Sequence, residues 1–213
     1  MRKTFDAELQ ELNYEMIDMA AAAEDAIDVV VQSLASSDDD AARSVVEMTR
    51  HMDEMERDIE NRCLRLLLQQ QPVARDLRTI SSALKMISDM ERIGDQASDI
   101  AEITRDIEDS PVISHVPIAE MARSTIGMVT DSIDSFVRKN LGLAQEVIRK
   151  DDEIDRMFLE VKDELIRRIG QGDSGETCMD LLMIAKYFER IGDHACNIAE
   201  WVEYSLTGQH GDM

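Results

Sequence analysis

Two stretches of the chain carry the same acidic pattern: residues 91–95 and residues 189–193 both read ERIGD. Residues four apart lie on one face of a helix, so Glu91, Asp95 and Asp99 should form a single stripe of carboxylates. Like charges at this spacing repel one another by a few tenths of a kcal/mol even on an exposed surface. We therefore expect a cation to compensate them.

The candidate ligands are all carboxylates and occur in both halves of the chain. Oxygen-only ligand sets suit hard cations such as Mg²⁺, Mn²⁺, Ca²⁺ or ferric iron, and suit zinc or copper less well. We expect bound metal ions, with iron, manganese or magnesium favoured over zinc. The predicted metal ligands are Asp53, Glu91, Asp95 and Asp99 in the first half and Asp151, Asp155, Glu189 and Asp193 in the second.

Three of these acids occupy positions where the helical repeat requires apolar side chains. Apolar residues that recur at steps of three and four lead into Glu91, Asp151 and Glu189. A carboxylate in a helix core loses its hydration and needs a compensating partner. Gly94 and Gly192 follow in mid-helix, where glycine costs roughly 1 kcal/mol relative to alanine. We infer that a partner helix or a ligand lies close against this face.

The main alternative is an acidic stripe paired with arginines, without metal. The pattern Glu/Asp-x-x-x-Asp occurs eight times, where about five matches arise by chance in so acidic a chain, so the spacing alone is weak evidence. Its placement among apolar residues, twice and at matching places, is stronger. Arg92 and Arg190 directly follow the glutamates but should face another direction, so we do not expect them to neutralise the stripes.

The composition indicates a helical protein without a membrane span. Only 4% of the 213 residues are aromatic and three are proline, which favours helix over sheet. No apolar run approaches about eighteen residues and the N-terminus lacks a signal peptide, so we expect a cytoplasmic protein. The net charge of −22 disfavours nucleic acid and anionic lipid as direct partners. The three cysteines should be reduced, buried small hydrophobes.

The apolar periodicity predicts an all-α fold of two tandem homologous three-helix bundles. AIDVVV (26–31) parallels SIDSFV (132–137), and the offset between matching stretches falls from 106 to 98 residues along the chain. We expect a first bundle over residues 1–110, a linker over 111–117 and a second bundle over 118–213. The first helix should end within SLASSDDD (33–40), and the others should span about 39–71, 72–108, 117–140, 142–170 and 175–206.

Motifs for catalysis are missing from the sequence. Ferritin-like di-iron enzymes use Glu-x-x-His on two helices, and none of the four histidines has a glutamate three residues before it. No G-x-S-x-G, P-loop or Cys–His arrangement occurs. We therefore expect a non-enzymatic protein, with a carboxylate-bridged metal enzyme as the least favoured alternative.

The tandem ERIGD motifs, QQQPVARDLR (69–78) and ERIGDHACNIAEWVEY (189–204) together resemble the PhoU family over essentially the whole chain. These are accessory and regulatory proteins of the bacterial phosphate-specific transport system. The resemblance implies two homologous three-helix bundles that bind metal clusters through paired acidic motifs. Carried over by position, the motifs are Glu91–Asp95, Asp151–Asp155 and Glu189–Asp193. In the second helix Thr49 replaces the first acid and leaves Asp53 alone, so the first site should be one carboxylate short.

The resemblance also implies what the protein contacts. It implies a non-catalytic cytoplasmic adaptor, often a homodimer, that engages the ATP-binding subunit of the phosphate ABC transporter and the phosphate-responsive sensor histidine kinase. The membrane would be reached only indirectly, through these partners. Such a protein restrains phosphate uptake and holds the phosphate-starvation response off when phosphate is plentiful. QPVARDLR (71–78) has no evident ligand role and is either a packed helix corner or a docking surface for a partner protein.

Overall fold

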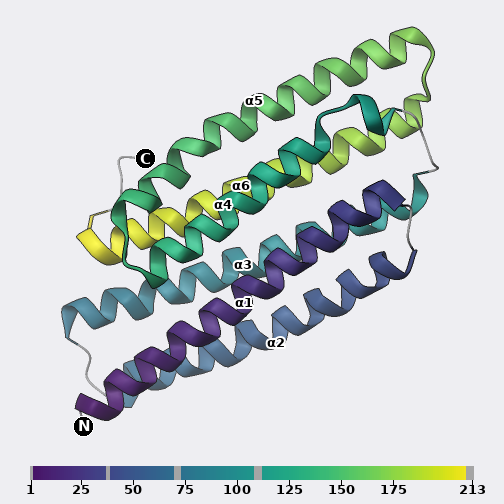
Figure 1. Cartoon of the computed structure of the whole chain (residues 1–213). Helices are drawn as coiled ribbons and strands as arrows, with labels where there is room; N and C mark the ends of the chain where they lie inside the picture. Colours follow the sequence, from purple (N-terminus) through teal and green to yellow (C-terminus); the bar gives the residue numbers. More distant parts are fainter. Residues whose placement is uncertain (1, 37–38, 70–72, 108–111, 210–213) are drawn as a thin grey trace.

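A computed structural model describes residues 2–36, 39–69, 73–107 and 112–209 of the chain. Across these ranges it contains six long helices and no strand (Figure 1), which confirms the all-α prediction. The helix bounds agree with those expected to within three residues wherever the expected ends fall inside the described ranges. The elements are α1 (Arg2–Ser36), α2 (Asp39–Gln69), α3 (Ala74–Asp106), the short 3₁₀ helix η1 (Ile113–His115), α4 (Ile118–Val137), α5 (Leu141–Gln171) and α6 (Gly175–Thr207).

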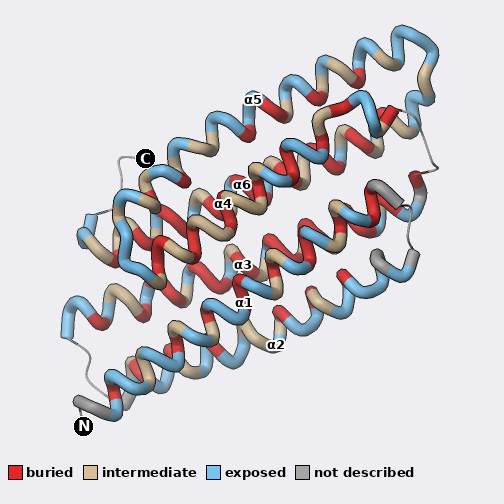
Figure 2. Tube along the Cα trace, viewed as in Figure 1, coloured by how far each residue is buried: buried red, intermediate tan, exposed pale blue. Residues whose placement is uncertain are grey.

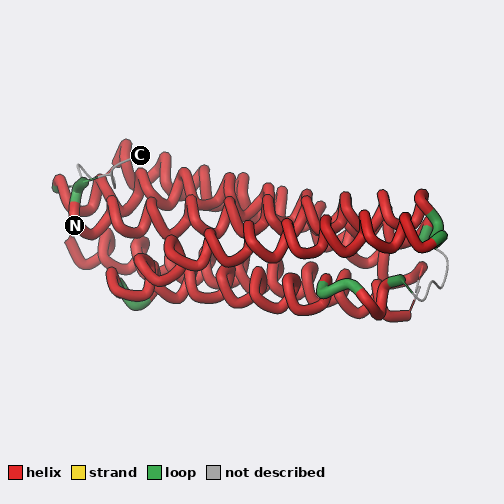
Figure 3. The backbone as a smooth tube through the Cα atoms, turned by 90° about the horizontal axis from the view of Figure 1, so that it is seen from above, coloured by secondary structure: helices red, strands yellow, loops and turns green. Residues whose placement is uncertain are grey.

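The helices form two three-helix bundles that pack side by side. Helices α1–α3 contact one another, as do α4–α6, and the two groups meet through α3 against α6 and α1 against α4. Helices α2 and α5 lie on opposite outer sides of the molecule (Figure 1). Seen from above, the helices run along one elongated rod (Figure 3). The expected tandem repeat is therefore present as two equivalent units.

Contacts between the halves are reciprocal, which gives the molecule an approximate two-fold relation. Asp89 of α3 accepts a hydrogen bond from Asn197 of α6 at 3.2 Å. The repeat offset of 98 residues relates Asp89 to Tyr187 and Asp99 to Asn197. The Tyr187 hydroxyl is hydrogen-bonded to Asp99, so this second pair repeats the first with the halves exchanged. His194 Nδ1 also lies 2.9 Å from Asp89 Oδ1, so this histidine has a structural role at the interface.

Most of the apolar residues that recur at steps of three and four form the core along both bundles (Figure 2). Leu77, which begins the apolar repeat that leads into Glu91, is an exception: it lies in the first turn of α3 and is 47% exposed. The expected linker, in its described part 112–117, is itself packed, since Val112 and Val116 are buried on either side of η1.

Close helix approach at two glycines is confirmed. A Cβ atom at Gly94 of α3 would lie 2.9 Å from Met52 Sδ of α2, and one at Gly192 of α6 would lie 3.3 Å from Ile154 Cγ2 of α5. Met52 and Ile154 are equivalent residues of the repeat, at the offset of 102. Glycine at these sites therefore lets α2 pack on α3, and α5 on α6, in the same way in both halves.

The turn between α4 and α5 contains a strained residue. Lys139 has φ 52° and, among the described residues, is the non-glycine residue with positive φ. The amide of Asn140 donates to Ser135 O at 2.9 Å, as in the motif that ends many helices with a left-handed glycine. A non-glycine residue there costs about 1 kcal/mol, so Lys139 lowers the local stability of this turn. No described helix is both long and apolar enough to cross a membrane.

Alanine substitutions at glycines should separate helix propensity from packing. A Cβ atom at Gly127 of α4 would have no neighbour within 4 Å, so Gly127→Ala should stabilise the fold by about 1 kcal/mol. Gly192→Ala should be at least about 1 kcal/mol less favourable than Gly127→Ala, because branched Ile154 cannot move away from the new methyl group. Urea unfolding of both variants measures this difference, and equal gains would show that α5 does not pack tightly at Gly192.

Candidate functional site

A first cluster of carboxylates lies between α2 and α3. Burial raises the pKa of Glu91, and the charges of Asp95 on α3 and of Glu56 and Asp53 on α2 raise it further. Burial also raises the pKa of Asp95, with the charges of Asp53 and Asp99 adding to the effect. The structure thus brings Asp53 within electrostatic reach of both acids of the first ERIGD motif.

Arg92 is a cationic neighbour of this cluster. Its Nε lies 3.5 Å from Glu91 Oε2, and its charge lowers the pKa of Glu91 and of Asp95 against the effect of burial. The expectation that Arg92 faces elsewhere was therefore wrong, because its flexible side chain reaches back along the surface. Since that side chain is 62% exposed, the pair contributes little and leaves the cluster under repulsion.

The second cluster lies between α5 and α6. Burial raises the pKa of Asp151 to about 6, and the charges of Asp193, Asp155 and Glu189 contribute to this rise. Burial likewise raises the pKa of Asp193, with Glu189 and Asp155 adding to it. The four carboxylates predicted as ligands in the second half are therefore neighbours. Burial and then Asp151 also raise the pKa of Cys196 to about 12, which keeps this thiol protonated.

Two further residues, Lys186 and Glu56, belong to these clusters and were missed in the sequence. Lys186 forms an ion pair with Glu189 Oε2 and lies 5.3 Å from the centre of the Phe158 ring. At the equivalent place in the first half, Ser88 donates a hydrogen bond to Glu56 at 3.0 Å. Spacing could have revealed both, because Lys186 stands three residues before Glu189 and Glu56 three residues after Asp53, on shared helix faces.

Glu56 changes the balance between the halves. The sequence predicted that Thr49 leaves the first cluster one carboxylate short. Thr49 is indeed packed inside, where its hydroxyl contacts Val45 O at 3.0 Å and Gly94 O at 3.2 Å. With Glu56 the first cluster nevertheless has four neighbouring acids, and the second has four acids together with Lys186. Each cluster thus has a cationic neighbour, Arg92 beside Glu91 in the first and Lys186 beside Glu189 in the second.

The carboxylates lie at the edge of the core, so the expectation of two buried acidic stripes was wrong. Glu91 and Glu189 keep 22% and 13% of their side-chain surface exposed, while Asp155 and Asp193 are exposed. The reason is that alternate positions of the apolar repeat are covered unequally. On α3, Leu84, Glu91 and Ser98 are half-buried, whereas Ile87, Gly94 and Ala101 are buried.

The other residues singled out in the sequence, Asp99 and the three cysteines, also differ in how far they are buried. Asp99 is half-buried and acts on Tyr187 of α6 as well as on Asp95, so it lies toward the other half of the molecule. Cys63 and Cys178 are buried as expected, but Cys196 is half-buried at the edge of the second cluster; all three are free thiols.

The donor chemistry of both clusters fits a hard cation. Each offers carboxylate oxygens only, from two helices, and no described lysine or arginine is ion-paired with Asp53, Asp151, Asp155 or Asp193. Within the described ranges, no three His, Cys, Asp or Glu side chains are grouped as closely as the ligands of one metal ion. A cation would therefore require the side chains to rotate inward, which the exposed Asp155 and Asp193 are free to do.

Comparison with known proteins gives the same duplication. The family model of the PhoU domain matches this chain twice, over residues 16–104 and 118–202. The chain belongs to the PhoU family. Each match of the PhoU domain covers most of one three-helix bundle and contains one of the two carboxylate clusters.

Relatives in the PhoU family align over nearly the whole chain. A phosphate-specific transport system accessory protein PhoU homolog from Clostridium acetobutylicum is 34% identical, over 100% of this chain and 98% of its own length. A homolog from Aquifex aeolicus is 36% identical, over 86% and 84%. The crystal structure of PhoU from Pseudomonas aeruginosa superposes with a TM-score of 0.89 at 31% identity, covering 96% of this chain and 100% of that one. A regulatory protein PhoU of Streptococcus pneumoniae gives the same TM-score at 25% identity, with coverages of 98% and 100%.

The burial of Asp151 and the repulsion from its neighbours have a consequence for stability in the absence of metal. The folded-state pKa of Asp151 is raised from 3.8 to about 6, so its ionised form destabilises the fold, and this penalty is lost as the pH falls from 7 toward 4. In chelator, Asp151→Asn should therefore be more stable than the unsubstituted protein at pH 7, and the difference should shrink at pH 5. Urea unfolding at both pH values measures this.

The matched control is Asp163→Asn, which removes an exposed carboxylate from the same helix and should change stability little at either pH. If Asp151→Asn is destabilising at pH 7, then Asp151 makes favourable contacts and the cluster is not under net repulsion.

Proposed function

We propose that this protein is a non-catalytic, metal-binding regulator of phosphate uptake and of phosphate-starvation signalling. The observation that carries the proposal is the match of the PhoU domain to both halves, together with a carboxylate cluster in each. The names of full-length relatives, which are accessory proteins of the phosphate-specific transport system, support the link to phosphate transport.

The proposed regulator acts through protein partners. They are the ATP-binding subunit of the phosphate ABC transporter and the phosphate sensor histidine kinase, and the protein engages them in the cytoplasm, as a homodimer. Through them it restrains uptake and holds the starvation response off when phosphate is plentiful. A net charge of −22 favours partner surfaces that are basic.

The proposed metal sites are the two carboxylate clusters. In the first, Asp53, Glu91 and Asp95 would hold the ion, with Asp99 and Glu56 beside them. In the second, Asp151, Asp155, Glu189 and Asp193 would do so. A hard cation such as iron, manganese or magnesium would neutralise these neighbouring carboxylates, and would tie α2 to α3 and α5 to α6. Burial and then the charges of neighbouring acids raise the pKa values of Glu91, Asp95, Asp151 and Asp193, as expected where a compensating cation is needed.

Metal content tests this part of the proposal. Protein purified without chelator should retain iron, manganese or magnesium, and Asp151→Ala combined with Glu189→Ala should lose the ions of the second cluster. Glu146→Ala combined with Asp163→Ala is the control, since it removes the same charge from exposed positions of α5 and should leave metal content unchanged. Elemental analysis by mass spectrometry gives both numbers. Absence of metal from the unsubstituted protein, with no loss of thermal stability in chelator, would favour the metal-free adaptor.

The regulatory part is tested in cells. Deleting the gene should derepress a phosphate-starvation reporter in phosphate-rich medium, because the proposed brake on the sensor kinase is gone. The gene supplied in trans should restore repression, and the control variant with Glu146→Ala and Asp163→Ala should restore it as well. An unchanged reporter in the deletion strain at high phosphate would overturn the regulatory function, whatever the metal content.

A further inference from the structure

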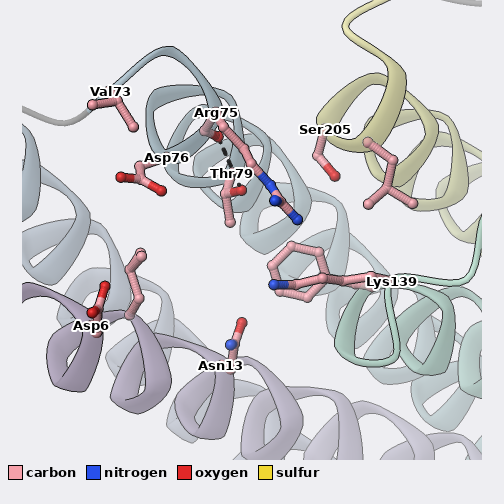
Figure 4. A pocket seen from close by; sticks show the side chains of 11 residues that line it. Asp6, Asn13, Val73, Arg75, Asp76, Thr79, Lys139 and Ser205 are labelled. Carbon is pink, nitrogen blue, oxygen red and sulfur yellow. Dashed lines mark hydrogen bonds between the residues drawn. The ribbon is translucent and has the colours of Figure 1, made fainter.

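A pocket of about 310 Å³ lies where the two halves meet at one end of the rod. Its walls come from α1, the start of α3, the end of α4 and the end of α6 (Figure 4). None of the acids of the two carboxylate clusters lines it. Its polar lining residues that matter here are Asp6, Asn13, Arg75, Asp76, Thr79 and Lys139.

Two cations from different halves of the chain point into this pocket. Figure 4 shows the Arg75 guanidinium and the Lys139 ammonium group directed toward its centre, while Asp6 and Asp76 lie on the opposite wall. Neither Arg75 nor Lys139 is ion-paired with a described residue, although the chain has 45 acidic residues against 23 lysines and arginines. Two positive groups thus face the pocket without an ion pair to any described residue.

Both cations are placed where they disfavour folding. Arg75 lies in the first turn of α3, at the positive end of the helix dipole, where a cation is unfavourable, and the N-cap residue Val73 provides no side-chain hydrogen bond. Lys139 occupies the left-handed position that glycine would fill without strain. Residues that oppose stability at a pocket are characteristic of ligand contacts.

The opposite wall restricts what kind of anion fits. The Asp6 and Asp76 carboxylates only accept hydrogen bonds, and each carboxylate has about four lone-pair sites, so it can accept one more donor beside its existing partners. A fully ionised oxyanion such as sulfate would be repelled by these groups. A hydrogenphosphate group has unprotonated oxygens for the cations and a P–OH donor for a carboxylate, and so matches both walls.

We propose that this pocket binds a hydrogenphosphate group, either inorganic phosphate or the head of a small phosphomonoester. Arg75 and Lys139 bind the unprotonated oxygens, and Asp6 or Asp76 accepts the P–OH hydrogen bond. Because Arg75 comes from the first bundle and Lys139 from the second, the ligand bridges the halves. The inference deepens the proposed function, and rests on it for its physiological meaning, since it gives the regulator a direct contact with phosphate.

Calorimetric titration of the full-length protein tests the pocket. The protein is treated with chelator first, because phosphate could otherwise bind to cations in the carboxylate clusters. Titrations with inorganic phosphate and with glycerol phosphate distinguish the free anion from a phosphomonoester as the ligand. Sulfate, which has no hydroxyl donor at neutral pH, tests the role of the carboxylates. Phosphate should bind with one site per chain and at least tenfold more tightly than sulfate. Arg75→Gln and Lys139→Gly should each weaken phosphate binding at least tenfold.

The two variants are chosen so that misfolding cannot explain a loss. Each removes an unfavourable feature, so thermal unfolding should show unchanged or higher stability for both. Lys85→Gln is the matched control: it removes an exposed lysine further along α3 and should bind phosphate like the unsubstituted protein.

Each remaining outcome decides against a defined part of the proposal. Absence of saturable binding at millimolar phosphate, or equal loss in Lys85→Gln, overturns the pocket. Equal affinity for sulfate overturns the role of the carboxylates and with it the choice of hydrogenphosphate. If phosphate fails to bind while deletion of the gene still derepresses the starvation reporter, the pocket is refuted and the regulatory function stands. If phosphate binds and deletion leaves the reporter unchanged, the pocket stands and the regulatory function is refuted.

Discussion

Close packing of one helix pair in each half, α2 on α3 and α5 on α6, is the constraint on which the rest of the structure depends. Gly94 and Gly192 permit it, since a side chain there would meet Met52 or Ile154. The same approach buries acids of two helices and brings them within electrostatic reach of one another. The burial and the repulsion that raise the pKa of Asp151 to about 6 therefore follow from the packing. A cation between the helices would remove that repulsion without loosening the core.

Helices α3 and α6 connect the two kinds of site. One side of each carries the acids of an ERIGD motif, and another side carries the contacts between halves, such as Asp89 with Asn197 and His194. The ends of the same helices line the proposed phosphate pocket with Arg75 on α3 and Ser205 on α6. A shift of α3 relative to α6 would therefore be felt at the clusters, at the interface and at the pocket, which would suit the proposed regulator.

The sequence was most informative where a repeating pattern governs the structure. Helix order, the duplication and the pairing of Asp53 with Glu91 follow from the apolar period and from the repeat, because both restrict which faces meet. Burial of the acids could not be predicted, since the repeat does not say how fully neighbouring helices cover each position. Glu56 was overlooked because its equivalent in the second half is Phe158, so the comparison of the halves concealed it. The pocket could not be predicted as a whole, because its residues come from separate elements; QPVARDLR was singled out and supplies Arg75 and Asp76, but nothing in the sequence places Lys139 opposite them.

The most direct test of the central claim is to locate the cations themselves. Crystals grown with Mn²⁺ should show anomalous scattering peaks between Asp53 and Glu91 and between Asp151 and Glu189, with carboxylate oxygens at about 2.1–2.3 Å after inward rotation of the exposed aspartates. Anomalous maps with no peak at either cluster, at Mn²⁺ concentrations that saturate known carboxylate sites, would contradict the account. The acidic motifs would then be adaptations of a metal-free adaptor surface.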